Sequence, residues 1–295
     1  MFDMEEIKYN EIGQDCIRKF TALESDILCE CKTITEPIDP SKDIHNHDGH
    51  EILLVLDGSM NLYTEFGGIK LQHGNLICIH EFDFHRGELI TKEKYDRIVI
   101  NVKGLVLKQI SSQMTDLESC FQKHPSIPLN VIQLTKEEIS TFESCARSLQ
   151  QSLSGKNMGD DLLIDAYLKQ IMVMVNRHFL SHEIPVHTEI MPSLVVETFK
   201  YIENHLSEEI TLKKLEDHIH HNGTYISRCF KKITGISLQQ FIITKKIAVS
   251  CKLLREGHLP CDVCYMTGFN NYSNYSRTFS KYIGLSPKQY QMEHR

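Results

Sequence analysis

The sequence predicts an α+β protein with several domains: an N-terminal β-barrel, a helical middle segment, and an all-α C-terminal domain with two helix-turn-helix motifs. One stretch occurs twice, as YISRCFKKITGISLQQF at residues 225–241 and as NYSRTFSKYIGLSPKQY at residues 274–290. Short apolar runs between turn residues fill an earlier part of the chain, and positive charge gathers near its end. An internal repeat is typical of one supersecondary unit used twice.

Charge is divided unevenly along the chain. Residues 193–295 contain 14 Lys and Arg against 9 Asp and Glu, whereas residues 1–192 contain 18 against 30. The chain as a whole has a net charge of −7, so its positive charge is concentrated in one region. This distribution is expected of a protein in which one domain binds the phosphates of a nucleic acid and the other does not. The start, MFDMEEIKYN, lacks the apolar core of a signal peptide, and no run has the length of a membrane span. We therefore expect a cytoplasmic protein without a membrane partner.

The first part of the chain has the pattern of a β-domain. Between His45 and Val102, the runs ILLVLDGSMNLYTEF, GIKLQHGNLICIHEF and YDRIVINV are separated by turn residues such as Asp57-Gly58. Short strands at this spacing are typical of a sandwich or barrel. Residues 1–107 are therefore predicted to form a β-domain.

A group of candidate ligands lies within this β-domain. His45, His47 and Glu51 share parity, so on one extended strand they would point to the same face, into the barrel, and His85 follows later. Three imidazoles and a carboxylate suit zinc, nickel or iron. The same four residues could instead form the polar lining of an effector pocket, and both possibilities stay open.

Residues 108–184 change to a helical period. Thr135 and Glu138 have the spacing of a capping box that begins a helix toward Leu153. A second helix, DDLLIDAYLKQIMVMVNRHFL, has apolar residues nearly all round, which predicts burial on two sides. One side is expected to meet either the β-domain or a second copy of the chain, so we interpret this as a packing and dimerisation segment. Residues 185–192 then have the composition of a linker.

Ten cysteines are scattered through both halves of the chain. This distribution is more typical of reduced core thiols than of a disulfide framework. Cys261 and Cys264 form a CxxC pair, but neither zinc ligands nor a thioredoxin-like context is evident nearby, so a core position is favoured for both. A thiol-based redox regulator is a further function class, for which no distinctive cysteine pair stands out.

Residues 193–295 form the basic domain, where each copy of the repeat lies inside a helix-turn-helix. Thr211 and Asn222 are expected to cap the helices of the first motif, and Gly235 to end it. A helix through Leu254, about 27 Å long, joins the motifs and suits recognition helices in successive major grooves. Short polar and basic side chains on the outer faces fit base edges and phosphates. The predicted DNA contacts are Thr224, Ser227, Arg228, Lys231, Lys232, Asn274, Ser276, Arg277 and Lys281.

Both halves resemble known proteins. SRCFKKITGIS, KKIAVSCKLL, GFNNYSNYSRTFSKYIGLSP and the closing KQY resemble the DNA-binding signature of the AraC/XylS family of transcription regulators, over about residues 195–292. His45, His47, Glu51 and Gly58 match HxHxxxExxxxxxG, the first motif of the cupin fold. The family resemblance implies a domain with two helix-turn-helix motifs behind a cupin-like domain that binds an effector and dimerises.

Several positions depart from these patterns. His80 and Phe82 stand where the second cupin motif has proline and glycine. Glu216 stands where the family has a small alanine, and a carboxylate there would be costly if it were fully buried. Asn222 replaces a serine cap in the first repeat, whereas Ser273 is expected to keep it in the second. The first motif is therefore the weaker match.

The sequence thus predicts a sequence-specific DNA-binding transcriptional regulator, an activator by family resemblance, and not an enzyme. A small-molecule effector in the cupin-like domain is expected to control it. The expected partners are double-stranded promoter or operator DNA, the effector, a second copy of the chain and RNA polymerase. The rival from another class is a metal-dependent cupin enzyme, such as an iron dioxygenase, with an accessory helical domain.

Overall fold

The structure is a computed structural model. It describes residues 20–21, 25–35, 43–91, 94–122, 129–180 and 189–294. The chain divides into two compact units. One contains Ala22–Asn204 and Ile210–Leu238, and the other contains His205–Glu209 and Gln239–Arg295.

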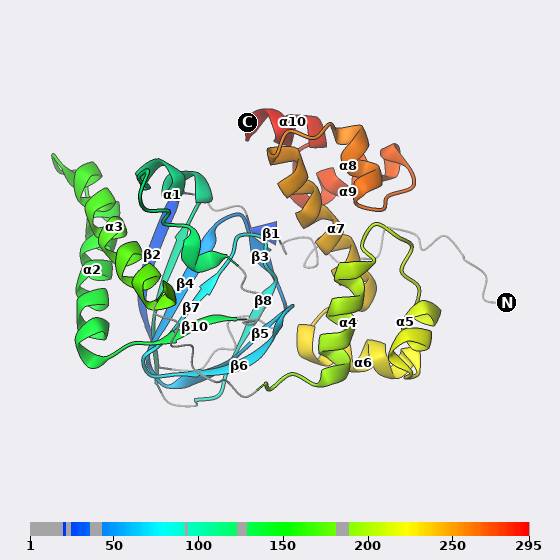
Figure 1. The fold of residues 1–295 in the computed structure, drawn as a ribbon, viewed down its shortest axis with the longest axis horizontal. Helices are drawn as coiled ribbons and strands as arrows, with labels where there is room; N and C mark the ends of the chain where they lie inside the picture. Colours follow the sequence, from blue (N-terminus) through cyan, green and yellow to red (C-terminus); the bar gives the residue numbers. More distant parts are fainter. Residues whose placement is uncertain are drawn as a thin grey trace. The chain divides into compact units, whose positions relative to one another are not determined.

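Strands come first along the chain and helices later. The strands are β1 (Phe20–Thr21), β2 (Ile27–Ile34), β3 (Asn46–His47), β4 (His50–Asp57), β5 (Ser59–Thr64), β6 (Gly67–Gln72), β7 (Asn75–Ile79), β8 (His85–Leu89), β9 (Tyr95–Val102) and β10 (Asn130–Gln133). The helices are α1 (Gly104–Ile110), the short 3-10 helix η2 (Ser119–Phe121), α2 (Lys136–Ser154), α3 (Asp160–Leu180), α4 (Ser193–Asn204), α5 (Leu212–Ile219), α6 (Gly223–Thr234), α7 (Leu238–Arg255), α8 (Pro260–Met266), α9 (Tyr272–Ile283) and α10 (Pro287–Glu293). The predicted order of a β-rich part followed by a helical part is confirmed (Figure 1).

The β-domain is built from facing antiparallel sheets. Within the described ranges, one sheet has the strand order β10-β7-β4-β9-β2 and another has the order β6-β5-β8. Leu53 and Val99 of the first sheet share a buried cluster with Leu62 and Ile69 of the second, so this cluster lies between the sheets. It fills the interior of the predicted barrel.

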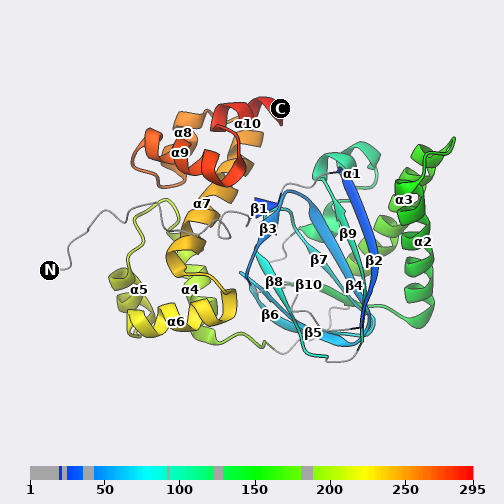
Figure 2. The ribbon, with the colours of Figure 1, turned by 180° about the vertical axis from the view of Figure 1, so that it is seen from behind.

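The outer face of the larger sheet is covered by α2 and α3, as the views from both sides show (Figures 1 and 2). Ile52 and Leu54 of β4 belong to a second buried cluster, together with Phe142 of α2 and Leu168 and Met172 of α3. Since alternate residues of β4 face opposite sides, the strand is buried on both faces. This explains its continuous apolar run, which in a half-exposed strand would alternate with polar residues.

The middle segment contains the expected helices and one unexpected strand. Thr135 Oγ1 accepts a hydrogen bond from Glu138 N at 3.3 Å, and Thr135 N donates to Glu138 Oε2 at 2.9 Å, so the predicted capping box begins α2. β10, which pairs with β7, was not predicted. It has only four residues and forms an edge of the sheet, so its alternation is too short to stand out.

Helices α4 to α6 contain the first helix-turn-helix, with its predicted caps in place. Thr211 Oγ1 accepts from Lys214 N at 3.3 Å, and Asn222 Oδ1 accepts from Thr224 N at 3.0 Å. Gly235 ends α6 with a φ of 79°, a left-handed conformation that glycine adopts without strain. The structure confirms all three expected helix boundaries.

Glu216, whose carboxylate would be costly if fully buried, is only half-buried and has a hydrogen-bond partner. Its Oε1 accepts a hydrogen bond from the backbone N of Gly223 at 2.5 Å. Gly223 is the first residue of α6, so the carboxylate faces the positive end of that helix dipole. The acid therefore stabilises the turn between α5 and α6.

Replacing Glu216 by alanine is expected to lower the local free energy of unfolding of α6 by about 1–2 kcal/mol, because an N-terminal hydrogen bond and a dipole interaction are lost. Native-state hydrogen exchange of the α6 amides in the full chain measures this. Asp217→Ala, which removes the neighbouring exposed acid, should change the exchange much less. Unchanged or slower exchange in Glu216→Ala would contradict the assignment.

Helices α7 to α10 form the second helix-turn-helix. Lys246 Nζ of α7 donates to the carbonyl of Gly268 at 2.7 Å, which ties α7 to the turn before α9. The expected serine cap is wrong: Asn271 caps α9 by accepting from Asn274 N at 3.1 Å, and Ser273 lies inside the first turn. Both residue types can cap a helix, and the chain enters the helix two residues earlier than expected.

The described cysteines are all free. The core position expected for the CxxC pair is confirmed for Cys264, whose side chain is buried, and is wrong for Cys261, which is exposed. The two positions lie three apart on α8, and only one of them faces the interior. No helix within the described ranges is long and apolar enough to cross a membrane.

Candidate functional site

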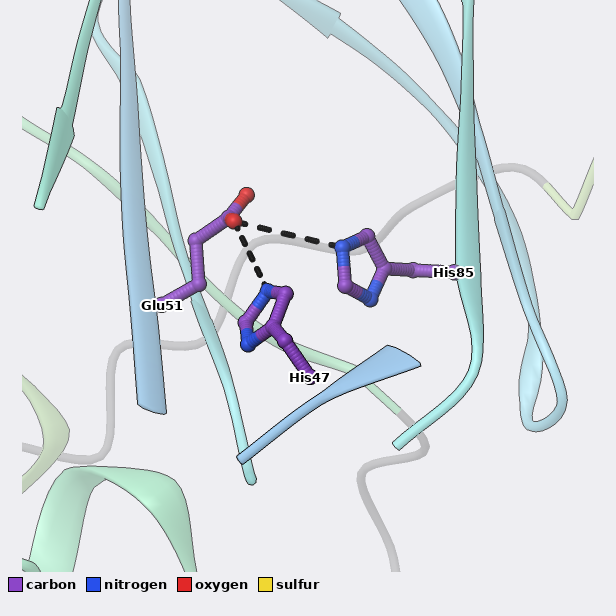
Figure 3. Close-up of side chains that lie close together, drawn as sticks. All are labelled: His47, Glu51 and His85. Carbon is purple, nitrogen blue, oxygen red and sulfur yellow. Dashed lines mark hydrogen bonds and ion pairs between the residues drawn. The ribbon is translucent and has the colours of Figure 1, made fainter. Parts of the chain in front are cut away.

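Three ionisable side chains converge between the sheets of the β-domain. His47 of β3, Glu51 of β4 and His85 of β8 each place one ligand atom within 4.8 Å of the others (Figure 3). His47 Nε2 lies 3.1 Å from Glu51 Oε2, and His85 Nε2 lies 3.9 Å from the same oxygen. We call these three residues the His–Glu cluster.

The route by which the cluster forms differs from the expectation of one continuous strand. β3 ends at His47 and β4 begins at His50, so the chain bends between them. Glu51 points inward because it has the same parity on β4 as Leu53, a member of the inner core. His47 reaches this carboxylate across the bend, and His85 approaches from the facing sheet (Figure 3).

His45, the fourth predicted residue, lies beside the cluster. Its backbone bridges to His85, with His45 N donating to the His85 carbonyl at 3.0 Å and His85 N donating to the His45 carbonyl at 2.9 Å. The two rings lie 4.4 Å apart between centroids, whereas the rings of His45 and His47 lie 6.4 Å apart. His45 thus fixes the position of His85 and lines the same site.

Asn101 also belongs to the site, although the sequence did not single it out. Its Nδ2 donates to Glu51 Oε2 at 3.0 Å, and its side chain is buried. Asn101 lies directly opposite Glu51 in the register of β4 and β9. That register joins residues far apart in the chain, so no local spacing pattern could have found it.

Burial and hydrogen bonding set the charges in the site. Burial would raise the pKa of Glu51, but the hydrogen bond from His47, the nearby histidine charges and the bond from Asn101 together hold that pKa well below its usual range. Burial would lower the pKa of His47, yet the bond to Glu51 and its charge raise it. Burial, together with repulsion from His45, lowers the pKa of His85 to about 3. Glu51 is therefore ionised and His85 neutral near pH 7.

This donor set fits a divalent transition metal. Metal ligands must be deprotonated. Glu51 and His85 already are, whereas His47, whose pKa is raised by Glu51, has to release any proton that it carries when a metal binds. Metal–ligand distances of about 2.0–2.2 Å place neighbouring donors roughly 3–3.5 Å apart, close to the separations within the cluster. The set of two imidazoles and one carboxylate suits iron and zinc, and nickel also accepts imidazole. Asn101 would hold the carboxylate in orientation by its hydrogen bond.

The DNA-contact residues predicted on α6 lie on its outward face. Ile226 and Phe230 are buried against the rest of the first motif. Thr224 and Arg228 are exposed, and Ser227 is half-buried beside them. Lys231 and Lys232 are exposed one turn further along the helix.

On α9 the same division recurs. Tyr275 and Phe279 are fully buried, while Asn274 and Arg277 are exposed. Ser276 is half-buried. Lys281, near the C-terminal end of α9, is exposed as well. Each helix therefore presents its own set of short polar and basic side chains to solvent, the arrangement expected of a recognition helix.

Family models match both parts of the chain. Residues 34–172 match the AraC-like ligand binding domain, and residues 215–293 match a helix-turn-helix domain. The chain belongs to the AraC family of transcriptional regulators. The His–Glu cluster lies inside the ligand-binding match, and α6 and α9 lie inside the helix-turn-helix match.

Two relatives of this AraC family chain are similar to it over most of their length. The probable transcriptional regulator LumQ of Photobacterium leiognathi is 23% identical over 262 residues, covering 87% of this chain and 94% of LumQ. The uncharacterized HTH-type transcriptional regulator YobQ of Bacillus subtilis (strain 168) is 24% identical over 278 residues, covering 90% and 93%. Apo ToxT from Vibrio cholerae strain SCE256 aligns at a TM-score of 0.38 with 13% identity, covering 92% of this chain and 98% of that one.

Proposed function

We propose that this regulator is a cytoplasmic, non-enzymatic activator whose DNA affinity is set by a small effector at the His–Glu cluster. The ligand that the donors fit best is a divalent metal ion, zinc, nickel or iron, bound by His47, Glu51 and His85 with His45 adjacent. The buried apolar cluster that contains Leu53 and Val99 lies between the same sheets as the site. The donor atoms of the His–Glu cluster all lie within 4.8 Å of one another, so a compact ligand suits the site.

The observation that carries the proposal is the contact between the flanks of the cluster and the end of α6. Arg86 Nη1 donates to the carbonyl of Ile233 at 2.5 Å and to that of Lys232 at 3.4 Å. Ile44 N donates to the carbonyl of Thr234 at 2.6 Å. These are the last carbonyls of the first recognition helix, whose negative dipole end favours a cation.

The two contacting residues are sequence neighbours of two site residues. Ile44 precedes His45, and Arg86 follows His85 on β8, where successive side chains point to opposite faces. A ligand that draws His85 toward Glu51 would move β8 and the bridged segment at His45. That movement would change the hydrogen bonds from Arg86 to α6. Ligand occupancy of the site and DNA affinity would therefore be linked.

The test is Arg86→Met in the full chain. Calorimetry with Zn²⁺, Ni²⁺ and Fe²⁺ in turn measures metal binding. The metal affinity of the variant should stay within about twofold of the wild-type affinity. The change in operator affinity on adding metal, expected to be about 5- to 150-fold in wild type for a coupling of this kind, should fall to less than about twofold. Lys70→Met, which removes an exposed charge from β6 of the same sheet, should retain the full response.

Two results would overturn the proposal. Metal that binds wild type without changing operator affinity would remove the coupling. Absence of metal binding in wild type would remove the metal as ligand. Oxygen consumption by the iron-loaded protein with organic substrates would instead favour the rival dioxygenase reading.

A homodimer and contact with RNA polymerase complete the proposed function. Leu162 and Leu163 near the start of α3 are 72% and 43% exposed, which is unusual for large apolar side chains at adjacent positions of one helix. A second copy of the chain is the proposed partner for this face. Sedimentation of the full chain tests the dimer, and transcription in vitro with purified polymerase tests activation.

A further inference from the structure

Two cysteines come together on β2, an edge strand of the larger sheet. Cys29 and Cys31 lie two residues apart, so their side chains point to the same face, toward α2. Cys29 is buried, and its Sγ donates to the carbonyl of Ala146 on α2 at 3.3 Å. Cys31 is half-buried, and packs against the margin of the same core. Cys31 is thus partly reachable from solvent, and Cys29 is buried beside it on the same face of the strand.

The two thiols differ in acidity because they interact with each other and differ in burial. The interaction with Cys29 lowers the pKa of Cys31 to about 7, helped by the positive charge of Arg147 and opposed by burial and by Glu143. The same interaction and burial raise the pKa of Cys29. Near neutral pH Cys31 is partly a thiolate, the nucleophilic form, and Cys29 stays protonated.

A second thiol pair in the same domain lacks these properties. Cys78 and Cys120 contact each other, but both are fully inside the core, and burial raises the pKa of Cys78. Such thiols are inert because neither water nor an oxidant reaches them. This pair is an internal control for the first.

We propose that Cys29 and Cys31 form a dithiol site that hydroperoxides oxidise to a reversible disulfide. The Cys31 thiolate attacks the outer oxygen of the hydroperoxide, the O–O bond breaks, and an alkoxide or hydroxide leaves and takes up a proton. The Cys29 thiol then attacks the sulfenic sulfur, forming the S–S bond and releasing water. In total, two thiols and one hydroperoxide give one disulfide, one alcohol or water, and one further water.

The geometry predicts a reducible bond. Residues two apart on a strand lie about 6.6 Å apart between Cα atoms. Bridged cysteines usually lie between about 4.4 and 6.8 Å apart at Cα and about 3.5–4.5 Å apart at Cβ. Two side chains on the same face of a strand are further apart than this at Cβ, so the edge strand must bend locally to close the bridge, and the bridge would be strained. Strained disulfides have higher reduction potentials and are the ones that behave as switches. Closing the bridge would also withdraw the Cys29 donor from α2.

Mass spectrometry of the full chain tests the proposal. The reduced protein is treated with a few equivalents of hydrogen peroxide, denatured, blocked with N-ethylmaleimide and digested with trypsin. Both thiols fall in one peptide, residues 20–32, FTALESDILCECK. We expect this peptide to become unreactive toward the reagent and two hydrogen masses lighter, and to regain both labels after reduction. Cys78 and Cys120 should remain fully labelled.

Variants assign the steps. In Cys29→Ser, dimedone should trap a sulfenic acid at Cys31, and in Cys31→Ser, Cys29 should stay reduced. Arg147→Gln should slow oxidation roughly 3- to 10-fold by removing a nearby positive charge, while Glu143→Gln should accelerate it. The proposal would be overturned if peptide 20–32 stayed doubly labelled while the exposed Cys261 became oxidised. Equal rates of peptide oxidation in the Arg147 and Glu143 variants would also contradict it. The wild-type measurement decides the matter even if a cysteine variant fails to fold.

Discussion

Replacing Arg277 by alanine is expected to weaken specific operator binding roughly 5- to 150-fold, the range for losing one bidentate arginine contact to guanine. Arg277 is exposed on α9, opposite the buried Tyr275 and Phe279, so its guanidinium is free to enter a major groove. Binding to unrelated DNA, which depends on phosphate contacts, should fall by much less. Titration of labelled operator and of scrambled DNA at one salt concentration measures both.

Lys281→Ala is the contrasting variant. It removes an exposed positive charge from the same helix, and is expected to weaken operator and scrambled DNA alike and to reduce the salt slope by about one. If Arg277→Ala lowered both affinities equally, Arg277 would be a phosphate contact and not a base contact. An unchanged footprint would exclude it from the interface.

Replacing Glu51 by glutamine is expected to lower metal affinity on the order of 100-fold or more, beyond the effect typical of losing a supporting hydrogen bond. The amide has nearly the same shape and can still hydrogen-bond to His47, but it carries no charge for the metal. Atomic emission analysis of metal content after dialysis, followed by calorimetry, measures the change. The regulatory effect of metal on operator binding should disappear with it.

Asp57→Asn on the same strand is the matched control. Asp57 is exposed at the end of β4 and pairs with Lys94 at 3.4 Å, away from the His–Glu cluster. It should bind metal as the wild type does. Equal metal affinity in both variants would show that the metal, if bound, lies elsewhere.

Local signals were enough for the helices and for most of the site. Capping residues such as Thr135, Thr211 and Asn222 act within three residues of their own position, so their effect can be predicted from spacing alone. The outward positions of Arg228 and Arg277 follow from helical period in the same way.

Some contacts depend on how the elements pack, and spacing along the sequence could not predict them. Asn101 meets Glu51 only through the pairing of β4 with β9. Glu216 finds its partner at Gly223 only after the turn between α5 and α6 has formed. Cys29 and Cys31 became a distinctive pair only once β2 was known to be a strand facing α2, since on a helix they would diverge.

The hydrogen bonds from Arg86 and Ile44 to the end of α6 have a consequence for promoters. α6 belongs to the same compact unit as the sensor, whereas α9 belongs to the other. We expect a bound ligand to change mainly the affinity of α6 for its half-site. The affinity of α9 for the other half-site should stay the same. Operators that differ by small sequence changes in the half-site read by α6 would then respond to different extents to the same ligand. A single sensor could in this way set a different level of induction at each promoter.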